Sequence, residues 1–235
     1  MARATTKTKQ NASAREMVER IKSTIDDPAL VERRRAQITK AAIVAFSRNG
    51  FHASTIRGVA KQAKVSVGLI YQYIGDKEDL LFMALVGLLR AYREQIPPAV
   101  EGVVDPFQRF NKIVRSYCKV HGASTEATVL AYRETASLNK ERRNVIKQLE
   151  VETNQLIIDA IQDCIRAGVF EEDIDVDLFC YQIVMFSQAW ALKAWHFKSR
   201  MSIETYLERG LRLMLGGVMT AKGLRQYRAL LRNEE

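Results

Sequence analysis

Proline and glycine are scarce in this chain. Its 235 residues include four prolines and twelve glycines, which leaves few positions for the tight turns that an all-β fold needs. No window alternates apolar and polar residues for long, and no internal repeat is visible. Apolar residues recur instead at three- and four-residue steps, as they do on one face of a helix. The sequence therefore predicts an all-α fold.

Cysteines, histidines and long apolar runs are also few. Three widely spaced cysteines, Cys118, Cys164 and Cys180, lie in apolar helical patterns, which argues against a disulfide framework and favours buried thiols in a reducing compartment. With three histidines and no CxxC pair, no structural zinc site is expected. No stretch approaches the roughly 18 apolar residues of a membrane span, and the N-terminus lacks the apolar core of a signal peptide. We therefore expect a cytoplasmic protein with no metal and no membrane partner.

Sequence signatures of common enzymes are missing too. The chain holds no GxSxG, HExxH, P-loop or GxGxxG motif, and no close group of His, Asp and Glu suggests acid–base chemistry. We expect no catalytic residues and no cofactor, so the protein is predicted not to be an enzyme.

Positive charge is concentrated in the first third of the chain. Residues 1–79 hold 15 Lys and Arg against 8 Asp and Glu, whereas residues 80–235 hold 21 against 19. Such a basic segment suits a polyanion, because neutralising phosphates releases condensed counterions. A merely solvated basic surface is the alternative. Residues 1–15 carry four cations and no acid, and we interpret residues 1–27 as a basic, partly disordered N-terminal arm.

The length allows one long domain or a small and a larger domain, and the motifs favour two. We expect a smaller domain at residues 28–79 and a larger helical domain at residues 80–235. Helical periodicity, caps and the Pro97-Pro98 break define the expected helices outside the central motif. These cover about 16–27, 31–49, 77–95, 106–122, 125–137, 139–167, 176–198 and 202–218.

Residues 54–80 have the pattern of a helix-turn-helix. An apolar stripe of Ile56, Val59, Ala60 and Ala63 predicts one short helix, Lys64-Val65 a turn, and Ser66 the N-cap of a second helix over 67–73. The second helix of such a motif enters the major groove of DNA by its N-terminal end.

This segment resembles the DNA-binding domain of the TetR/AcrR family of repressors. The matching positions are Thr55, Val59, Ala60, Ala63, Val65, Ser66, Gly68, Ile70, Tyr71, Tyr73, Lys77 and Leu80. The resemblance implies that Thr55, Ser66, Tyr71, Tyr73 and Lys77 hold the DNA backbone. It also implies that Arg57, Val67 and Gly68 lie near phosphates or base edges. By the same resemblance, residues 28–79 are expected to form the DNA-binding domain and residues 80–235 a helical ligand-binding and dimerisation domain.

Two positions depart from the family pattern. Lys64 stands where a glycine is usual, so a lysine must adopt a conformation that is often left to glycine, and we count it as a further phosphate contact. Ile74 replaces the usual phenylalanine, which is a tolerable change in a core.

Aromatic residues with polar groups are frequent in the expected larger domain, and they support a ligand cavity. A plain aromatic core is the alternative for each residue taken singly. The candidate ligand-binding residues are Phe110, Tyr117, His121, Tyr132, Arg133, Phe186 and Trp190, with Trp195 nearby in the sequence. Arg133 and Glu134 interrupt an apolar helix, so they either pair internally or face solvent, a ligand or the DNA-binding domain.

Two segments, residues 131–146 and 190–210, are similar to TetR-type regulators of fatty-acid, steroid or aromatic-acid breakdown that respond to acyl-CoA thioesters. The similarity implies an acyl-CoA effector, for whose phosphates Arg133, Lys193, His196 and Lys198 are available. Because helices 176–198 and 202–218 are apolar around much of their circumference, we expect a homodimer. The overall expectation is a repressor of a palindromic double-stranded DNA operator, released by a small molecule. A helical interaction module that does not bind DNA is the alternative.

Overall fold

The computed structural model describes residues 14–233, with side chains up to residue 230. Residues 1–13 of the arm expected at residues 1–27 lie outside the described residues, and the described part of the arm contains a helical stretch over 14–19. Within the described chain every regular element is helical, and the one strand-like feature is an isolated bridge between Phe170 and Met219. The prediction of an all-α fold is confirmed.

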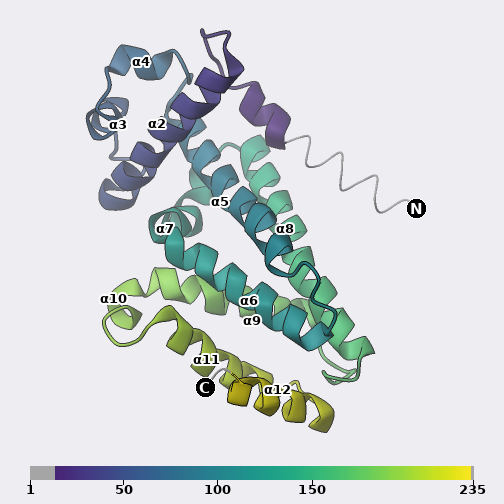
Figure 1. The fold of residues 1–235 in the computed structure, drawn as a ribbon. Coiled ribbons are helices and arrows are strands. Elements are labelled where there is room, and N and C mark those ends of the chain that lie inside the picture. The colour runs from purple at the N-terminus through teal and green to yellow at the C-terminus, as the bar shows by residue number, and fades with distance from the viewer. Residues whose placement is uncertain (1–13, 234–235) are drawn as a thin grey trace. The chain divides into compact units, whose positions relative to one another are not determined.

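The chain forms two compact units (Figure 1). The first comprises Met1–Arg90 and Glu126–Glu152, and the second Ala91–Thr125 and Thr153–Glu235. The following bounds define the helices. They are α2 (Pro28–Asn49), α3 (Ile56–Ala63), α4 (Val67–Tyr71), α5 (Lys77–Ala99), α6 (Pro106–Ala123), α7 (Thr125–Glu134), α8 (Lys140–Arg166), α9 (Val176–Leu192), α10 (Ala194–Phe197), α11 (Ile203–Leu215) and α12 (Ala221–Asn233). A 3₁₀ turn, Thr135–Ser137, follows α7.

Capping residues set several of these helix boundaries. Asp105 accepts a hydrogen bond from Gln108 N at the start of α6, and Asp76 accepts one from Asp79 N at the start of α5. Gly50 ends α2 with φ +80°, a conformation that glycine adopts without a steric penalty.

Three expected helix ends are wrong, and one helix was missed. The helix expected over 16–27 ends at residue 19. Helix α5 continues through Pro97 and Pro98 to Ala99, because the φ of proline fits a helix and the hydrogen bonds it removes fall in the last turns. The helix expected over 176–198 breaks at Lys193, whose φ of −114° and ψ of 30° separate α9 from α10. Helix α12 was not expected at all.

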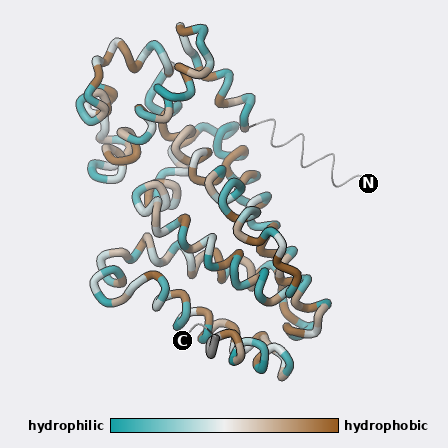
Figure 2. The backbone as a smooth tube through the Cα atoms, viewed as in Figure 1, coloured by the Kyte–Doolittle hydropathy of each residue, from teal (hydrophilic) through white to brown (hydrophobic). Residues whose placement is uncertain are grey.

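The two units have different cores. In the first unit, every residue of α5 from Leu80 to Val86 is apolar and buried. Figure 2 colours the backbone of both units by hydropathy. In the second unit, the rings of Phe107, Phe110, Phe170 and Phe179 pack against one another. A further cluster of Cys118, Trp190, Tyr206 and Leu207 lies in the same unit.

The three cysteines are buried, free thiols, as expected. Burial raises the pKa of Cys118, Cys164 and Cys180 to about 12 in each case, so these side chains behave as small apolar groups. No helix in the described part of the chain is long and apolar enough to cross a membrane.

Candidate nucleic-acid interface

Helices α3 and α4 form the expected helix-turn-helix. Thr55 caps α3 by accepting a hydrogen bond from Gly58 N at 3.1 Å, and Ser66 caps α4 in the same way through Leu69 N at 3.1 Å. Helix α3 buries Val59, Ala60 and Ala63. The remaining sides of both helices therefore stay available to a partner.

Lys64 joins the two helices in the left-handed conformation, with φ 57° and ψ 45°. Among the described residues it is the only non-glycine with a positive φ. The prediction that a lysine here adopts a glycine-like conformation is confirmed. Its side chain is exposed, next to the first turn of α4.

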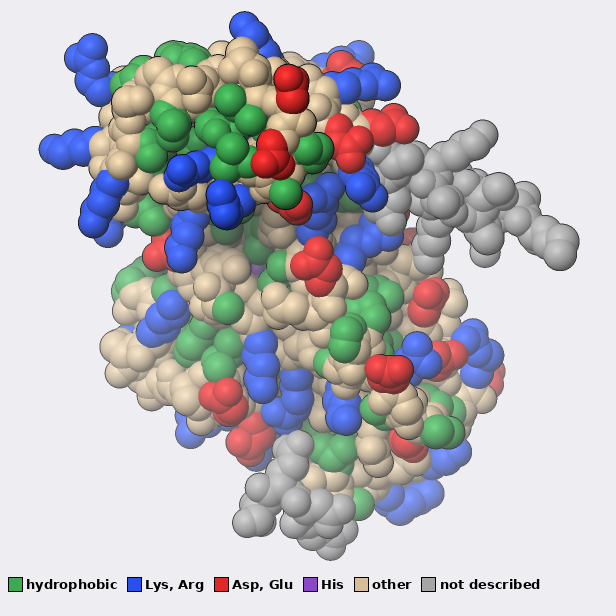
Figure 3. Space-filling model, turned by 45° about the horizontal axis from the view of Figure 1, so that its top comes forward, with side chains coloured by type: hydrophobic (Ala, Val, Ile, Leu, Met, Phe, Trp, Pro, Cys, Tyr) green, Lys and Arg blue, Asp and Glu red, His purple; other side chains and the backbone are tan. Residues whose placement is uncertain are grey.

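Most of the predicted DNA-contacting residues lie on the exposed surface of this motif. Thr55, Arg57, Lys64, Ser66 and Gly68 are exposed, and Val67 is half-buried. Tyr71 keeps 47% of its surface exposed although it follows the fully buried Ile70. In Figure 3, Lys and Arg side chains project around the edge of the part that holds α2 to α4. The surface thus combines cations with hydroxyl groups, which are the groups that contact DNA phosphates.

Two residues that were expected to contact the DNA backbone, Tyr73 and Lys77, are instead engaged within the protein. Tyr73 is 3% exposed and belongs to the core. The Lys77 ammonium donates hydrogen bonds to the carbonyls of Phe51 at 2.7 Å, His52 at 3.1 Å and Ser54 at 2.9 Å, and it lies 4.5 Å from the Phe51 ring centroid. Because its three donors are used within the protein, Lys77 holds the turn that leads into α3.

An acidic and basic network behind the motif was not expected from the sequence. Asp79 accepts hydrogen bonds from Gly75 N at 2.7 Å and Asp76 N at 3.1 Å, and it forms an ion pair with Arg142 of α8. Arg142 also lies 3.4 Å from Glu78. The start of α8 is thereby joined to the turn that follows α4. No sequence signal pairs positions 63 residues apart.

Glu134 has the internal role that was one of the alternatives for it. Its carboxylate accepts hydrogen bonds from Phe51 N at 3.5 Å and from the Ser137 hydroxyl at 2.8 Å. The Ser137 hydroxyl is also 3.0 Å from His52 Nε2. The end of α7 therefore contacts the turn between α2 and α3. The neighbouring Arg133 is exposed.

The candidate ligand residues fall into separate groups. Tyr117 and His121 are buried together with Tyr92, whose ring stacks on that of Tyr117 at 4.4 Å between centroids and whose hydroxyl lies 2.9 Å from the His121 ring nitrogens. The Tyr117 hydroxyl donates to Asn154 Oδ1 at 3.2 Å. Sequence reasoning missed Tyr92 and Asn154.

The other candidates lie elsewhere. Phe110 belongs to the phenylalanine core of the second unit. Phe186 stacks on Tyr206 with centroids 4.6 Å apart, and Trp190 packs against the same tyrosine. Tyr132, in the first unit, is 62% exposed. Within residues 14–233, no group of three or more His, Cys, Asp or Glu side chains is arranged to hold a metal ion.

Comparison with known proteins finds two family models on this chain. The model of bacterial regulatory proteins of the tetR family matches residues 38–84, and a tetracyclin repressor-like C-terminal domain matches residues 103–196. The HTH-type transcriptional regulator HbdR of Aromatoleum sp. (strain CIB) is 48% identical over 205 residues, which are 87% of this chain and 89% of that protein.

Solved structures share the fold at lower identity. The ketosteroid transcriptional regulator KstR2 of Mycobacterium tuberculosis has a TM-score of 0.69 at 20% identity, over 86% of this chain and 100% of that one. The fatty acid degradation regulator FadR of Bacillus halodurans has a TM-score of 0.65 at 18% identity, over 82% and 97%. From the HbdR match and the two family models, this protein belongs to the tetR family of bacterial regulatory proteins and is a DNA-binding transcriptional regulator, not an enzyme.

Proposed function

We propose that this regulator is a homodimeric repressor in the bacterial cytoplasm that binds a palindromic operator through α3 and α4 and is released by an acyl-CoA thioester. The observation that carries the DNA-binding part is the exposed surface of α4 and its N-cap, where Ser66, Gly68 and Tyr71 are exposed while Ile70 is fully buried. A protein that used α4 only for packing has no need of an exposed tyrosine beside an exposed glycine.

The DNA contacts we propose come from seven residues. They are Thr55, Arg57, Lys64, Ser66, Val67, Gly68 and Tyr71. Tyr73 and Lys77 support these residues from behind, since one is buried and the other binds three backbone carbonyls. Arg57 and Lys64 supply charge to phosphates, and the open surface at Gly68 allows the backbone of α4 to approach the groove.

An exposed apolar face on α9 supports the dimer. Leu178, Tyr181 and Met185 follow one another at three- and four-residue steps and are 57%, 45% and 47% exposed. Leu213 of α11 is 82% exposed. A second copy of the chain would cover such a face, and two motifs about one helical turn of DNA apart would then bind a palindrome.

The buried polar group of the second unit supports an effector with a carbonyl. Asn154 is 2% exposed, and its Nδ2 atom has no hydrogen-bond partner among the described residues. A buried donor without a partner is unfavourable, and a ligand carbonyl would satisfy it. Tyr92, Tyr117 and His121 add polar atoms and ring surface beside it.

Features around α10 support a coenzyme A portion. Trp195 is 76% exposed, and it is flanked by Lys193, Lys198 and Arg200 in a stretch without Asp or Glu from residue 178 to 203. An exposed indole stacks on a base, and neighbouring cations bind phosphates. KstR2 and FadR carry names that refer to ketosteroids and to fatty acid degradation, which agrees with the groups of regulators that residues 131–146 and 190–210 resemble.

Calorimetry with a panel of acyl-CoA thioesters and the matching free acids tests the effector. We expect at least one thioester to bind and to lower operator affinity. The variant Asn154→Leu should weaken that binding about tenfold or more by removing a buried hydrogen bond, and Trp195→Ala should weaken binding of the thioester but not of the free acid. Binding of no thioester would contradict the effector and leave the DNA-binding role intact.

A further inference from the structure

The end of α4 depends on a segment far away in the sequence. Helix α4 has five residues, and a helix this short is unstable on its own. The last carbonyl groups of a helix need hydrogen-bond partners outside the helix. No glycine provides a C-cap for α4, since the C-cap residue Gln72 is in the right-handed helical region. The Gln72 carbonyl instead accepts hydrogen bonds from Thr24 N at 2.9 Å and from the Ser23 hydroxyl at 3.2 Å.

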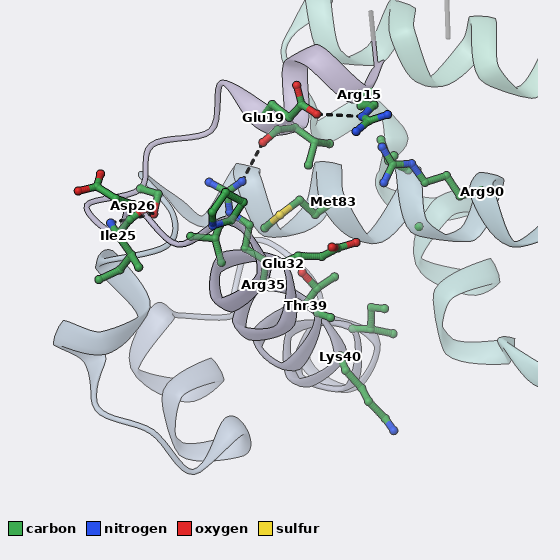
Figure 4. Close-up of a pocket in the computed structure, with 18 residues that line it drawn as sticks. Arg15, Glu19, Ile25, Asp26, Glu32, Arg35, Thr39, Lys40, Met83 and Arg90 are labelled. Atoms are coloured by element: carbon green, nitrogen blue, oxygen red, sulfur yellow. Dashed lines mark hydrogen bonds and ion pairs between the residues drawn. The ribbon is translucent and has the colours of Figure 1, made fainter. Parts of the chain in front are cut away.

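Arg35 of α2 provides the second connection. Its Nε donates to the Tyr73 carbonyl at 2.9 Å. Its two other nitrogens donate to the carbonyls of Val18 at 3.0 Å and Ile21 at 2.6 Å. One guanidinium group thus holds Tyr73, the second residue after α4, and also Val18 and Ile21. Val18 and Ile21 belong to the segment 14–25, which we call the N-terminal clasp. Figure 4 shows Arg35 on α2 with a hydrogen bond that reaches up to the clasp.

The position of Arg35 is unfavourable for a charge. The residue is 8% exposed, and burial lowers its pKa, while the nearby Asp79 acts in the opposite direction. A buried guanidinium is tolerated only when its donors are satisfied. Because the acceptors of these three bonds are backbone carbonyls, the bonds fix where two chain segments lie and are independent of the side chains there.

Apolar packing accounts for only part of the attachment of the N-terminal clasp to α2 and α5. Ala14 and Ile21 are buried, but a cavity of about 640 Å³ lies between the clasp, α2 and α5. Val18, Arg35, Met83 and Gly87 are among the residues that line it (Figure 4). The hydrogen bonds of Arg35, Ser23 and Thr24 therefore carry much of the attachment.

We propose that Arg35 is a positioning residue for DNA binding, because it locks the N-terminal clasp onto the end of α4 and so fixes the orientation of the exposed α4 surface. The inference rests on the proposed function, in which α4 contacts the operator. Arg35 itself does not contact DNA; it acts through the Tyr73 and Gln72 carbonyls and the backbone that carries Tyr71.

Two variants remove the attachment in different ways. Arg35→Met keeps the length of the side chain and removes its donors, and Thr24→Pro deletes the N–H group that bonds to Gln72. The control is Arg33→Met on the same helix, since Arg33 is exposed and forms no ion pair or side-chain hydrogen bond within the described part of the chain. All variants are full-length and are measured at a temperature where circular dichroism shows them folded.

The readouts are affinity for a selected operator, affinity for an unrelated duplex, and amide hydrogen exchange of residues 67–73. We expect Arg35→Met and Thr24→Pro to weaken operator binding about tenfold or more, the range of a lost charged or backbone hydrogen bond. Affinity for the unrelated duplex should change much less, and exchange in α4 should accelerate. Arg33→Met should lower both affinities by a similar small factor, because it removes only charge.

The outcomes separate the two proposals. If Tyr71→Ala weakens operator binding while both clasp variants bind the operator like the wild type, Arg35 has no positioning role and the α4 interface stands. If Tyr71→Ala also has no effect, the α4 interface itself is wrong. Equal losses on both duplexes in the clasp variants would show a general effect on the fold and overturn the positioning role. Where Arg35→Met does not fold, Thr24→Pro decides.

Discussion

At position 68, stability of the fold and DNA binding favour different residues. A Cβ atom at this position would meet only the Ser66 hydroxyl, at 4.0 Å, among the described atoms. The protein itself therefore has room for a side chain. Since glycine in a helix is less favourable than alanine, its presence points to a partner that comes close.

We predict that Gly68→Ala stabilises the fold and weakens DNA binding. Urea unfolding should show a gain of about 0.5–1 kcal/mol, the difference in helix propensity. Operator affinity should fall, because the added methyl group lies where the helix backbone meets the groove. If Gly68→Ala bound the operator as tightly as the wild type, close approach at this residue would be wrong.

Burial of His121 makes the stability of the fold depend on pH in a way that can be measured. Burial lowers its pKa from 6.5 to about 3 in the folded protein. Between these values the unfolded chain binds a proton that the folded chain does not, so stability falls as the pH is lowered below 6.5.

We predict that His121→Gln reduces the loss of folding stability at acidic pH. Stability of the wild type should decline by up to about 1.4 kcal/mol per pH unit from this group, as measured by urea unfolding at pH 7 and pH 5. The variant should lose less over the same interval. An identical pH dependence in both proteins would show that His121 is protonated in the fold.

Residues of the helix-turn-helix could be predicted because their signals are local. Thr55, Ser66 and Asp76 each accept a hydrogen bond from the backbone N–H three residues later, at the start of the helix that follows. The conformation of Lys64 was expected because this lysine replaces a glycine of the family pattern. The roles of Lys77 and Arg142 could not, because their acceptors are about 25 and 63 residues distant. A lysine bound to backbone carbonyls leaves no pattern in the sequence.

Among the helices, α9 and α11 pack closely at a glycine, Gly210 of α11. A Cβ atom at Gly210 of α11 would overlap the ring of Phe186 of α9, which in turn stacks on Tyr206. The absence of a side chain at Gly210 therefore sets how closely these two helices pack.

We predict that Gly210→Ala destabilises the protein. The displaced Phe186 ring should cost about 1–3 kcal/mol, as overpacking does, against a propensity gain of about 1 kcal/mol. The matched control is Gly87→Ala in α5, where nothing described lies within 4 Å of the new Cβ and urea unfolding should show a gain. Stabilisation by both substitutions would contradict the packing of α9 on α11.

Helix α12 shows where sequence patterns fail at this scale. Its start is capped by the Thr220 hydroxyl, which accepts from Gly223 N at 3.1 Å, and Gly223 lies against the Val169 backbone carbonyl. Gly216-Gly217 look like the end of the helical region, and a glycine inside the following segment weakens the expectation of a helix. The contacts of Gly223 with Val169 and of Tyr227 with Phe107 stabilise α12, which its helix propensity alone would not.

At the scale of the whole molecule, the sequence predicts a helical regulator and the proposed operator contacts, but not how the units are composed. Helices α5 and α8 each begin in the first unit and end in the second, so the compact units do not follow the order of the chain. Asp79, Glu134 and Arg142 join α7 and α8 to the helix-turn-helix within the first unit. We expect an effector to act through these contacts, since they link the start of α8 to the turn behind α4.

The most direct measurement is a salt titration of operator binding by the wild type and two variants, with a fluorescent duplex selected from random sequence. DNA binding through α3 and α4 predicts that wild-type affinity falls roughly 10³-fold between about 50 and 200 mM salt. It also predicts that Arg57→Ala binds more weakly with a slope smaller by about one. Lys147→Ala, which removes an exposed cation from α8, should keep the wild-type affinity and slope. Enrichment of no duplex, or a slope for Arg57→Ala equal to that of the wild type, would contradict DNA binding through α3 and α4.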